Sequence, residues 1–169
     1  MLPAESRKNM RQEIDSNTKA RLAVDDNNRV RQIIHLEQPW MSAETSPLLA
    51  AVDYMRHMDL LRVAETELAN PLEKVSFTEP REQGIEYRLG GVKTLFDTST
   101  IIFNQTCLNV PVWRAAITLT IKHNPNRIIS ATDTASITCR RKCPHSTRSP
   151  STGQSSPSPR LIDACACSA

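Results

Sequence analysis

Apolar and polar residues alternate strictly over residues 113–122, which is the pattern of a β-strand with one buried face. Trp113 heads the apolar side and is therefore predicted to point into the core. The triplet Asn124-Pro125-Asn126 predicts a turn, and residues 127–134 are expected to return as the neighbouring strand. The apolar side consists of Trp113, Ala115, Ile117, Leu119 and Ile121.

A β-hairpin is predicted at residues 21–36. Leu22 and Val24 alternate with polar residues before the turn, and an apolar strand follows it. Residues 25–28 are of types that tolerate the positive φ angles of tight hairpin turns. A calcium loop would need further oxygen ligands at fixed spacing, which this stretch does not have. The residues interpreted as a turn are Asp25, Asp26, Asn27 and Asn28.

Two further strands are predicted before Trp113. Residues 84–91 are expected to form a strand that stops at the pair Gly90-Gly91, and residues 93–108 a longer strand with a break near Asp97. The connections between the strands are too short for crossovers, so the sheet is expected to be antiparallel.

A helix is predicted from Pro47 to about Glu65. Ser46 is suited to cap it and proline to its first position, while Asn70-Pro71 ends any continuation. One helix packed on one face of an antiparallel sheet predicts the α+β fold class. The apolar stripe of the helix consists of Leu48, Ala51, Val52, Met55 and Met58.

Composition divides the chain into three parts: an N-terminal extension at 1–20, the α+β domain at 21–138, and a tail at 139–169. The tail holds seven Ser and four Pro but only one Leu and one Ile, so it is predicted to be disordered. The whole chain carries +3 and the tail +4, which leaves −1 on the first 138 residues. A nearly neutral body disfavours nucleic-acid binding.

Four of the five cysteines lie in the tail, and their spacing does not match a common zinc site. His145 is interpreted as a polar tail residue rather than a ligand. No metal and no cofactor is therefore predicted. The abrupt change in composition is also what out-of-frame translation would produce. The tail cysteines are Cys139, Cys143, Cys165 and Cys167.

The sequence contains no recognisable catalytic constellation. It lacks a His-Glu-x-x-His motif and a glycine-rich phosphate loop. A Cys-His dyad built on Cys107 has no basic cluster near it in the sequence, so this cysteine is interpreted as inert. The chain is therefore predicted not to be an enzyme. Asn104 begins an Asn-Gln-Thr glycosylation acceptor sequence, which matters only in a secretory pathway.

No apolar run approaches the roughly 18 residues of a membrane span, and no membrane partner is expected. The first 20 residues do not form a signal peptide as they stand. The chain is therefore expected to be cytoplasmic or to lack its true beginning.

The stretch 21–134 resembles the fungalysin/thermolysin propeptide (FTP) domain. The likeness rests on the order of elements and on a Phe-x-Gln…Pro-Val-aromatic stretch followed by a strand and an Arg-Ile-x-Ser return. Asn109 stands where that family usually has glycine, and asparagine also tolerates the left-handed conformation. The matching residues are Phe103, Gln105, Val110, Pro111, Val112, Trp113, Arg127, Ile128 and Ser130.

The resemblance implies a non-catalytic role. Such propeptides lie between a signal peptide and a secreted zinc metallopeptidase; they act as intramolecular chaperones and keep the zymogen inhibited. This chain has neither a signal nor a peptidase, so the expectation is a fragment or a stand-alone relative. Its partner would be a metallopeptidase catalytic domain. The candidate interface residues are Asp25, Asp26, Asn27, Asn28, Asn109, Val110, Pro111 and Val112.

Two alternatives stay open. One is a small-ligand-binding module with a pocket lined by the concave face of the sheet. The other is a chain whose basic tail attaches weakly to nucleic acid, although its five basic residues are not accompanied by aromatic residues for base stacking.

Overall fold

In the computed structural model, which describes residues 10–74 and 84–135, eight strands form a single sheet. The strand order is β1-β2-β3-β8-β7-β6-β5, and β4 pairs with β8 beyond the end of β3. All pairings between these strands are antiparallel, as the short connections predicted. The elements are β1 (Arg11–Ile14), β2 (Ala20–Val24), β3 (Val30–His35), β4 (Trp40–Met41), α1 (Pro47–His57), two 3-10 turns (Asp59–Leu61 and Glu65–Leu68), β5 (Ile85–Leu95), β6 (Thr98–Cys107), β7 (Val110–Lys122) and β8 (Arg127–Asp133).

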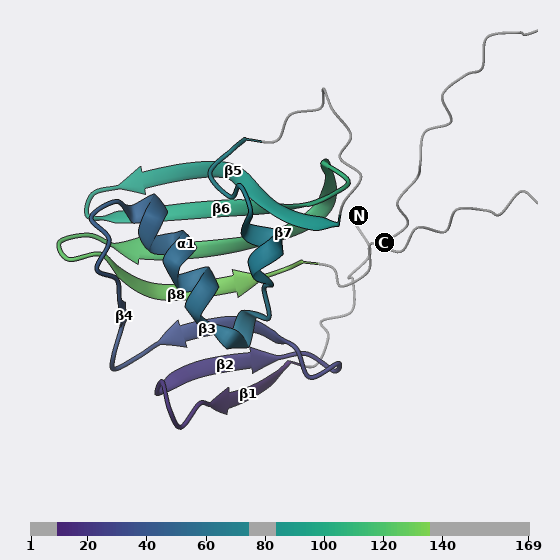
Figure 1. Ribbon diagram of the computed structural model, residues 1–169. Helices are drawn as coiled ribbons and strands as arrows, with labels where there is room; N and C mark the ends of the chain where they lie inside the picture. Colours follow the sequence, from purple (N-terminus) through teal and green to yellow (C-terminus); the bar gives the residue numbers. More distant parts are fainter. Residues whose placement is uncertain (1–9, 75–83, 136–169) are drawn as a thin grey trace, which may run out of the picture.

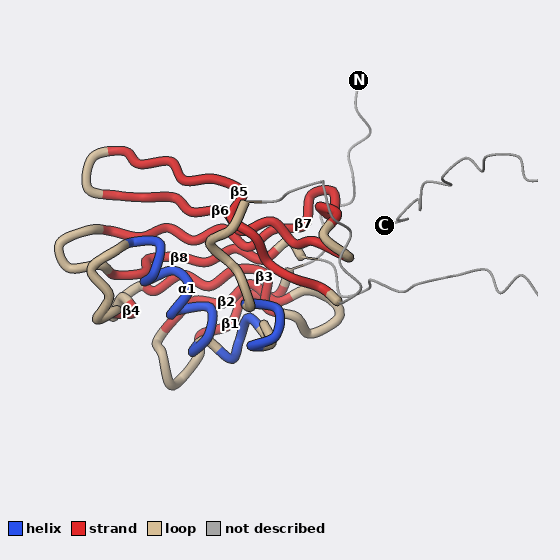
Figure 2. The backbone as a smooth tube through the Cα atoms, turned by 45° about the horizontal axis from the view of Figure 1, so that its top comes forward, coloured by secondary structure: helices blue, strands red, loops and turns tan. Residues whose placement is uncertain are grey.

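The core lies between α1 and one face of the sheet, which we call the inner face (Figures 1 and 2). Helix residues such as Tyr54 and Met55 pack against the alternate residues of the strands, and each buried aliphatic side chain adds about 1.5–3 kcal/mol. The sheet residues of this core that are fully buried include Ile33, Ile101, Phe103, Ile117, Leu119, Ile121 and Ile128. The opposite, outer face has no helix over it among the described residues.

The predicted α+β class is wrong, because the sheet dominates the fold. Strands hold 50% of the described residues and helical segments 15%. The helix ends at His57 rather than near Glu65, since Met58 leaves the helical conformation at φ −93° and ψ 86°. Two short 3-10 turns replace the expected continuation.

The glycine pair does not stop β5. The strand passes through it with a β-bulge between Leu89 and Gly91 and continues to Leu95. A Cβ atom on Gly90 would lie 2.6 Å from the side-chain nitrogen of Asn104, so glycine is needed where the two strands approach closely. The predicted break near Asp97 is confirmed as the turn between β5 and β6, and the predicted hairpin at 21–36 is confirmed as β2 and β3.

Trp113 does not face the core, contrary to the prediction from alternation, and is 84% exposed. Thr106 of β6 pairs with Pro111, whereas Asn104 pairs with Ala116. Four residues of β7, 112–115, therefore stand opposite one residue of β6. Within this bulge Arg114 has a φ of 56°, so the alternation is interrupted and the indole is directed into solvent.

Of the predicted domain boundaries, the structure describes the one near residue 20. β1 lies inside the stretch assigned to an N-terminal extension and pairs with β2 along its whole length. The expected disordered tail, with its cysteines and His145, lies outside the described residues.

Candidate functional site

Both predicted interface patches lie at the same end of the sheet. Strands β2, β6 and β8 run in the same direction, so their carboxyl ends lie at one end of the sheet (Figure 1). This end carries the turn after Val24, the turn after Cys107 and the end of β8 at Asp133. We call this the Trp113 end. The opposite end, which carries the β5–β6 and β7–β8 turns, is the Phe96 end.

In the first patch Asp25 organises the turn. One carboxylate oxygen accepts hydrogen bonds from the backbone amides of Asn27 (2.9 Å) and Arg29 (3.0 Å), and the other accepts one from Arg31 Nε (2.7 Å). Burial raises the pKa of Asp25, but these hydrogen bonds outweigh it and the pKa is lowered. The neighbouring Asp26, Asn27 and Asn28 are exposed, so they, rather than Asp25, are available to a partner.

The second patch is a two-residue hairpin turn. Cys107 pairs with Val110, and the turn residues Leu108 and Asn109 both have positive φ, 53° and 67°. Val110 is 54% exposed, and Pro111 and Val112 are partly exposed. The Arg114 guanidinium lies 5.9 Å from the centre of the Trp113 ring, a cation–π arrangement. Trp113 thus belongs to this patch, and no signal in the sequence distinguished it from a core residue.

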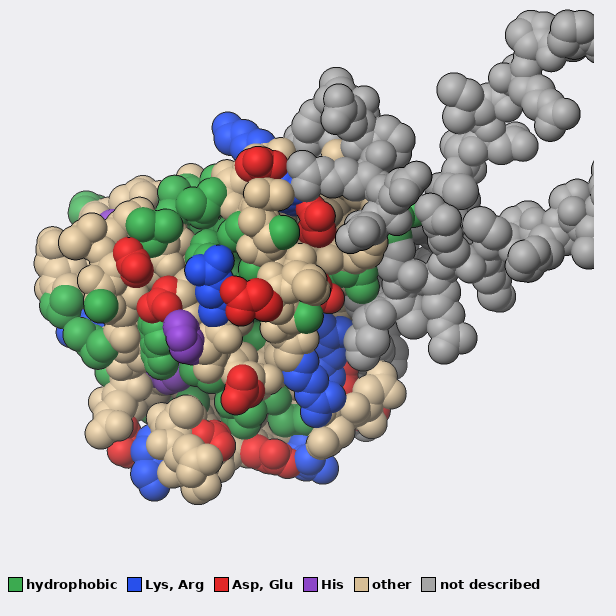
Figure 3. All heavy atoms as spheres, viewed as in Figure 1, with side chains coloured by type: hydrophobic (Ala, Val, Ile, Leu, Met, Phe, Trp, Pro, Cys, Tyr) green, Lys and Arg blue, Asp and Glu red, His purple; other side chains and the backbone are tan. Residues whose placement is uncertain are grey.

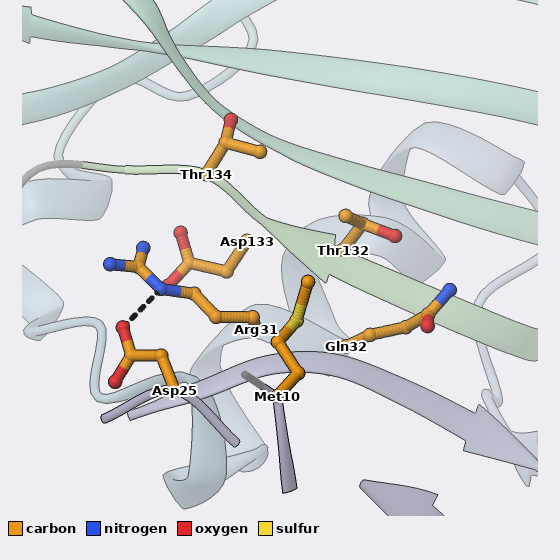
Figure 4. A pocket seen from close by; sticks show the side chains of 7 residues that line it. All are labelled: Met10, Asp25, Arg31, Gln32, Thr132, Asp133 and Thr134. Atoms are coloured by element: carbon orange, nitrogen blue, oxygen red, sulfur yellow. Dashed lines mark hydrogen bonds and ion pairs between the residues drawn. The ribbon is translucent and has the colours of Figure 1, made fainter. Parts of the chain in front are cut away.

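A hollow of about 370 Å³ lies between the two patches, where the pairing of β3 with β8 stops at Gln32 and Thr132 (Figure 4). Arg31 and Asp133 point toward each other within it, and Arg31 is held by its ion pair with Asp25. The lining residues are Met10, Asp25, Arg31, Gln32, Thr132, Asp133 and Thr134.

Behind the hollow lies a buried ion pair, Arg29–Asp133, with 2.8 Å between Nη2 and Oδ2. Both arginines, 29 and 31, also donate to the Ala135 carbonyl, and the Ala135 amide donates to Asp133 Oδ1 at 2.7 Å. Burial raises the pKa of Asp133 more than the Ala135 amide and Arg29 lower it. These contacts fasten the end of β8, which favours a structural role.

Each of the other residues considered for chemistry has at least one partner within the structure. Cys107 is buried and disulfide-bonded, so it offers no free thiol. His35 is buried with its Nε2 3.0 Å from the Tyr54 hydroxyl, and burial lowers its pKa. His57 pairs with Asp53, and His123 Nε2 lies 2.9 Å from Ser99 Oγ.

Asn104 lies in a strand that is paired on both sides, with its amide against Gly90. Its glycosylation stays a prediction.

Across residues 10–74 and 84–135, no group of three or more His, Cys, Asp or Glu side chains is placed to hold a metal ion. In the same part of the chain, every helix is too short or too polar to cross a membrane. Comparison with known protein families, curated proteins and solved structures found no match.

Proposed function

We propose that this chain is a non-catalytic binding domain that recognises a protein partner with its Trp113 end. The partner class that the propeptide resemblance suggests is the catalytic domain of a zinc metallopeptidase. The observation that carries the proposal is Trp113 itself, 84% exposed on a bulge beside the exposed Val110.

The backbone around Trp113 is costly to form. Leu108 and Arg114 both adopt left-handed conformations, which cost a non-glycine residue about 1–2 kcal/mol each. The bulge leaves a large aromatic side chain in solvent although the strand's pattern offers it a place on the apolar face. Strained backbone that presents a side chain is common at functional sites, and tryptophan and arginine are the residues most often found as binding anchors.

The rest of the Trp113 end supports contact with a macromolecule. A standard protein interface buries about 800 Å² on each partner, which is enough to span neighbouring turns of one sheet edge. A partner seated on Trp113 and on the exposed residues Asp26–Asn28 would also cover the hollow between them. Inhibition by such a domain requires that the partner's cleft be covered and needs no reactive group on this chain.

The experiment mixes the full chain with a thermolysin-like catalytic domain, either folded or during its refolding from denaturant. We expect lower residual proteolysis in the first case and a higher yield of active peptidase in the second. If neither quantity changes at micromolar concentrations, the metallopeptidase is not the partner. Hydrolysis by the purified chain alone would contradict the non-catalytic half of the proposal.

A second candidate function is binding of a small ligand in the hollow, which is about 370 Å³ in volume. The concave face expected for such a ligand is instead filled by the core, so the ligand would occupy the hollow at the strand ends. A ligand with hydroxyl or amine groups would suit Gln32 and Thr132. It would raise the melting temperature of the wild type by mass action. The variant Thr132→Leu, which narrows the hollow, is expected to lose that increase.

A further inference from the structure

The Phe96 end presents apolar side chains to solvent. Phe96 is 92% exposed and Leu95 62% exposed, both at the turn between β5 and β6. Phe96 occupies a left-handed conformation, φ 52°, which is unfavourable for an aromatic residue. The Asp97 carbonyl accepts a hydrogen bond of 2.7 Å from the His123 amide, so this turn is fastened to the β7–β8 turn.

The apolar tip continues into a row of five side chains on the outer face. Residues that pair directly in an antiparallel sheet share a face, and here the pairing passes through five strands. Two exposed apolar residues, Leu95 and Met41 (55% exposed), stand at the ends of the row, with two cations between them. The row is Leu95, Thr98, Lys122, Arg127 and Met41.

The next row on the outer face, like the first, contains no acidic residue. Its members are Lys93, Thr100, Thr120, Ser130 and Ile34. The two rows together hold three cations, four hydroxyl groups and no carboxylate. Asp97, 3.3 Å from Lys122 Nζ, belongs to the turn rather than to either row. The helix-bearing side of the molecule differs, since acidic and basic side chains are intermixed there (Figure 3).

We propose that the Phe96 end docks on an anionic lipid membrane, with Phe96, Leu95 and Met41 entering the headgroup region and Lys93, Lys122 and Arg127 contacting lipid phosphates. Cations beside exposed apolar side chains suit such a surface, because burial of the tip and attraction to anionic lipid act together. The hydroxyl groups of the two rows can donate hydrogen bonds to phosphate oxygens. A nucleic acid would be drawn to the same cations but would leave the aliphatic tip residues in water. This proposal departs from the expectation of no membrane partner, which rested on the lack of a membrane-spanning run, because docking on a membrane surface needs no such run.

The test is co-sedimentation of the full chain with vesicles of phosphatidylcholine alone or with about 30% phosphatidylserine, the anionic lipid of cytoplasmic leaflets. We expect binding to the anionic vesicles at least about tenfold tighter than to the neutral ones, falling as salt rises. Phe96→Ser is expected to weaken this binding about tenfold or more, since it removes a large apolar anchor. Arg127→Gln is expected to weaken this binding about fivefold, because the variant loses the attraction of one cation to the anionic headgroups.

The matched control is Trp113→Ser, which removes an equally exposed aromatic residue from the opposite end. The basic residues after position 138 are the same in all these variants, so differences between variants report on the Phe96 end alone. Equal binding by wild type and Phe96→Ser, equal loss in Trp113→Ser, or no binding to either vesicle would overturn the proposal. So would binding to duplex DNA that survives Phe96→Ser and competes with the vesicles. Both replaced side chains are almost fully exposed, and circular dichroism checks that the variants fold.

Discussion

Gly90 and Asn104 share one small volume between β5 and β6. Gly90 is the extra residue of the β5 bulge, and the Asn104 amide lies directly over it. The neighbouring Gly91 has no atom within 4 Å of the position that its Cβ would take. The two adjacent glycines thus differ: Gly90 leaves room for the Asn104 side chain, whereas a side chain at Gly91 would meet no neighbouring atom.

Gly90→Ala is expected to lower the free energy of unfolding by about 1–3 kcal/mol, because the new methyl group displaces the Asn104 side chain. Gly91→Ala is the matched control and is expected to change it by less than about 0.5 kcal/mol. Urea unfolding of both variants checks this. In the Asn104→Ala background the cost of Gly90→Ala should shrink, and an unchanged cost would show that the contact with Asn104 is not the cause.

Asp25 makes stability depend on pH. Its folded-state pKa lies below the unfolded value, so its stabilising effect is present above an ordinary Asp pKa of 3.8 and is lost as pH falls through the folded pKa. Asp133 acts in the opposite direction, because burial raises its pKa and its protonation in acid favours the folded state.

Asp25→Asn is expected to cost about 1.5–3 kcal/mol at pH 7, the contribution typical of hydrogen bonds to a charged group. It should also flatten the fall in unfolding free energy as pH decreases below about 4. Thermal unfolding at pH 7 and in the acid range measures both effects. Asp26→Asn removes the same charge from the exposed neighbour and is expected to change neither the stability at pH 7 nor its pH dependence. If its effects equal those of Asp25→Asn, the cause is general charge repulsion and not the hydrogen bonds of Asp25.

At the scale of elements, the β6–β7 hairpin combines a tight turn with a wide bulge. Leu108 and Asn109 occupy the two positions at which such turns need positive φ, and asparagine suits that conformation while leucine does not. The strain at Leu108 is therefore local and removable.

Leu108→Asn is expected to raise the free energy of unfolding by about 0.5–1 kcal/mol, because asparagine reaches the left-handed conformation at lower cost. Chemical denaturation of the variant measures the change. A loss of more than about 0.5 kcal/mol would mean that contacts of the partly buried leucine outweigh the backbone strain.

Local chemistry made several elements predictable from the sequence. Residues 25–28 and Asp97 mark true turns because their side chains and backbone preferences act within a few residues. The other features depend on distant partners. The bulge at 112–115 follows from the register of β7 against β6, and the passage of β5 through Gly90 depends on Asn104. Alternation alone therefore assigned Trp113 to the core, and the pair Gly90-Gly91 was interpreted as the end of the strand. The rows on the outer face depend on distant pairing in the same way and were not predicted.

For the whole molecule, the two ends of the sheet are distinct surfaces joined by one core. Each end carries one nearly fully exposed aromatic residue, Trp113 or Phe96, and the proposals assign them different partners. This separation predicts that the two surfaces can be changed independently of each other and of the fold.

Trp113→Ala and Phe96→Ala are each expected to change the free energy of unfolding by less than about 0.5 kcal/mol, as for other exposed positions. Phe103→Ala, at a fully buried ring, should cost about 3–5 kcal/mol. Denaturant unfolding of the three variants provides the comparison. A cost above about 2 kcal/mol for Trp113→Ala would mean that the indole stabilises the fold and would remove the basis for treating it as a free anchor.

The most direct test of the central claim is the inhibition constant of the chain against a thermolysin-like catalytic domain, measured for wild type, Trp113→Ala and Phe96→Ala. The account predicts inhibition by the wild type, a loss of at least about 2 kcal/mol in binding free energy for Trp113→Ala as for an interface anchor, and no loss for Phe96→Ala. Equal inhibition by all three proteins, or a loss confined to Phe96→Ala, would contradict recognition through the Trp113 end.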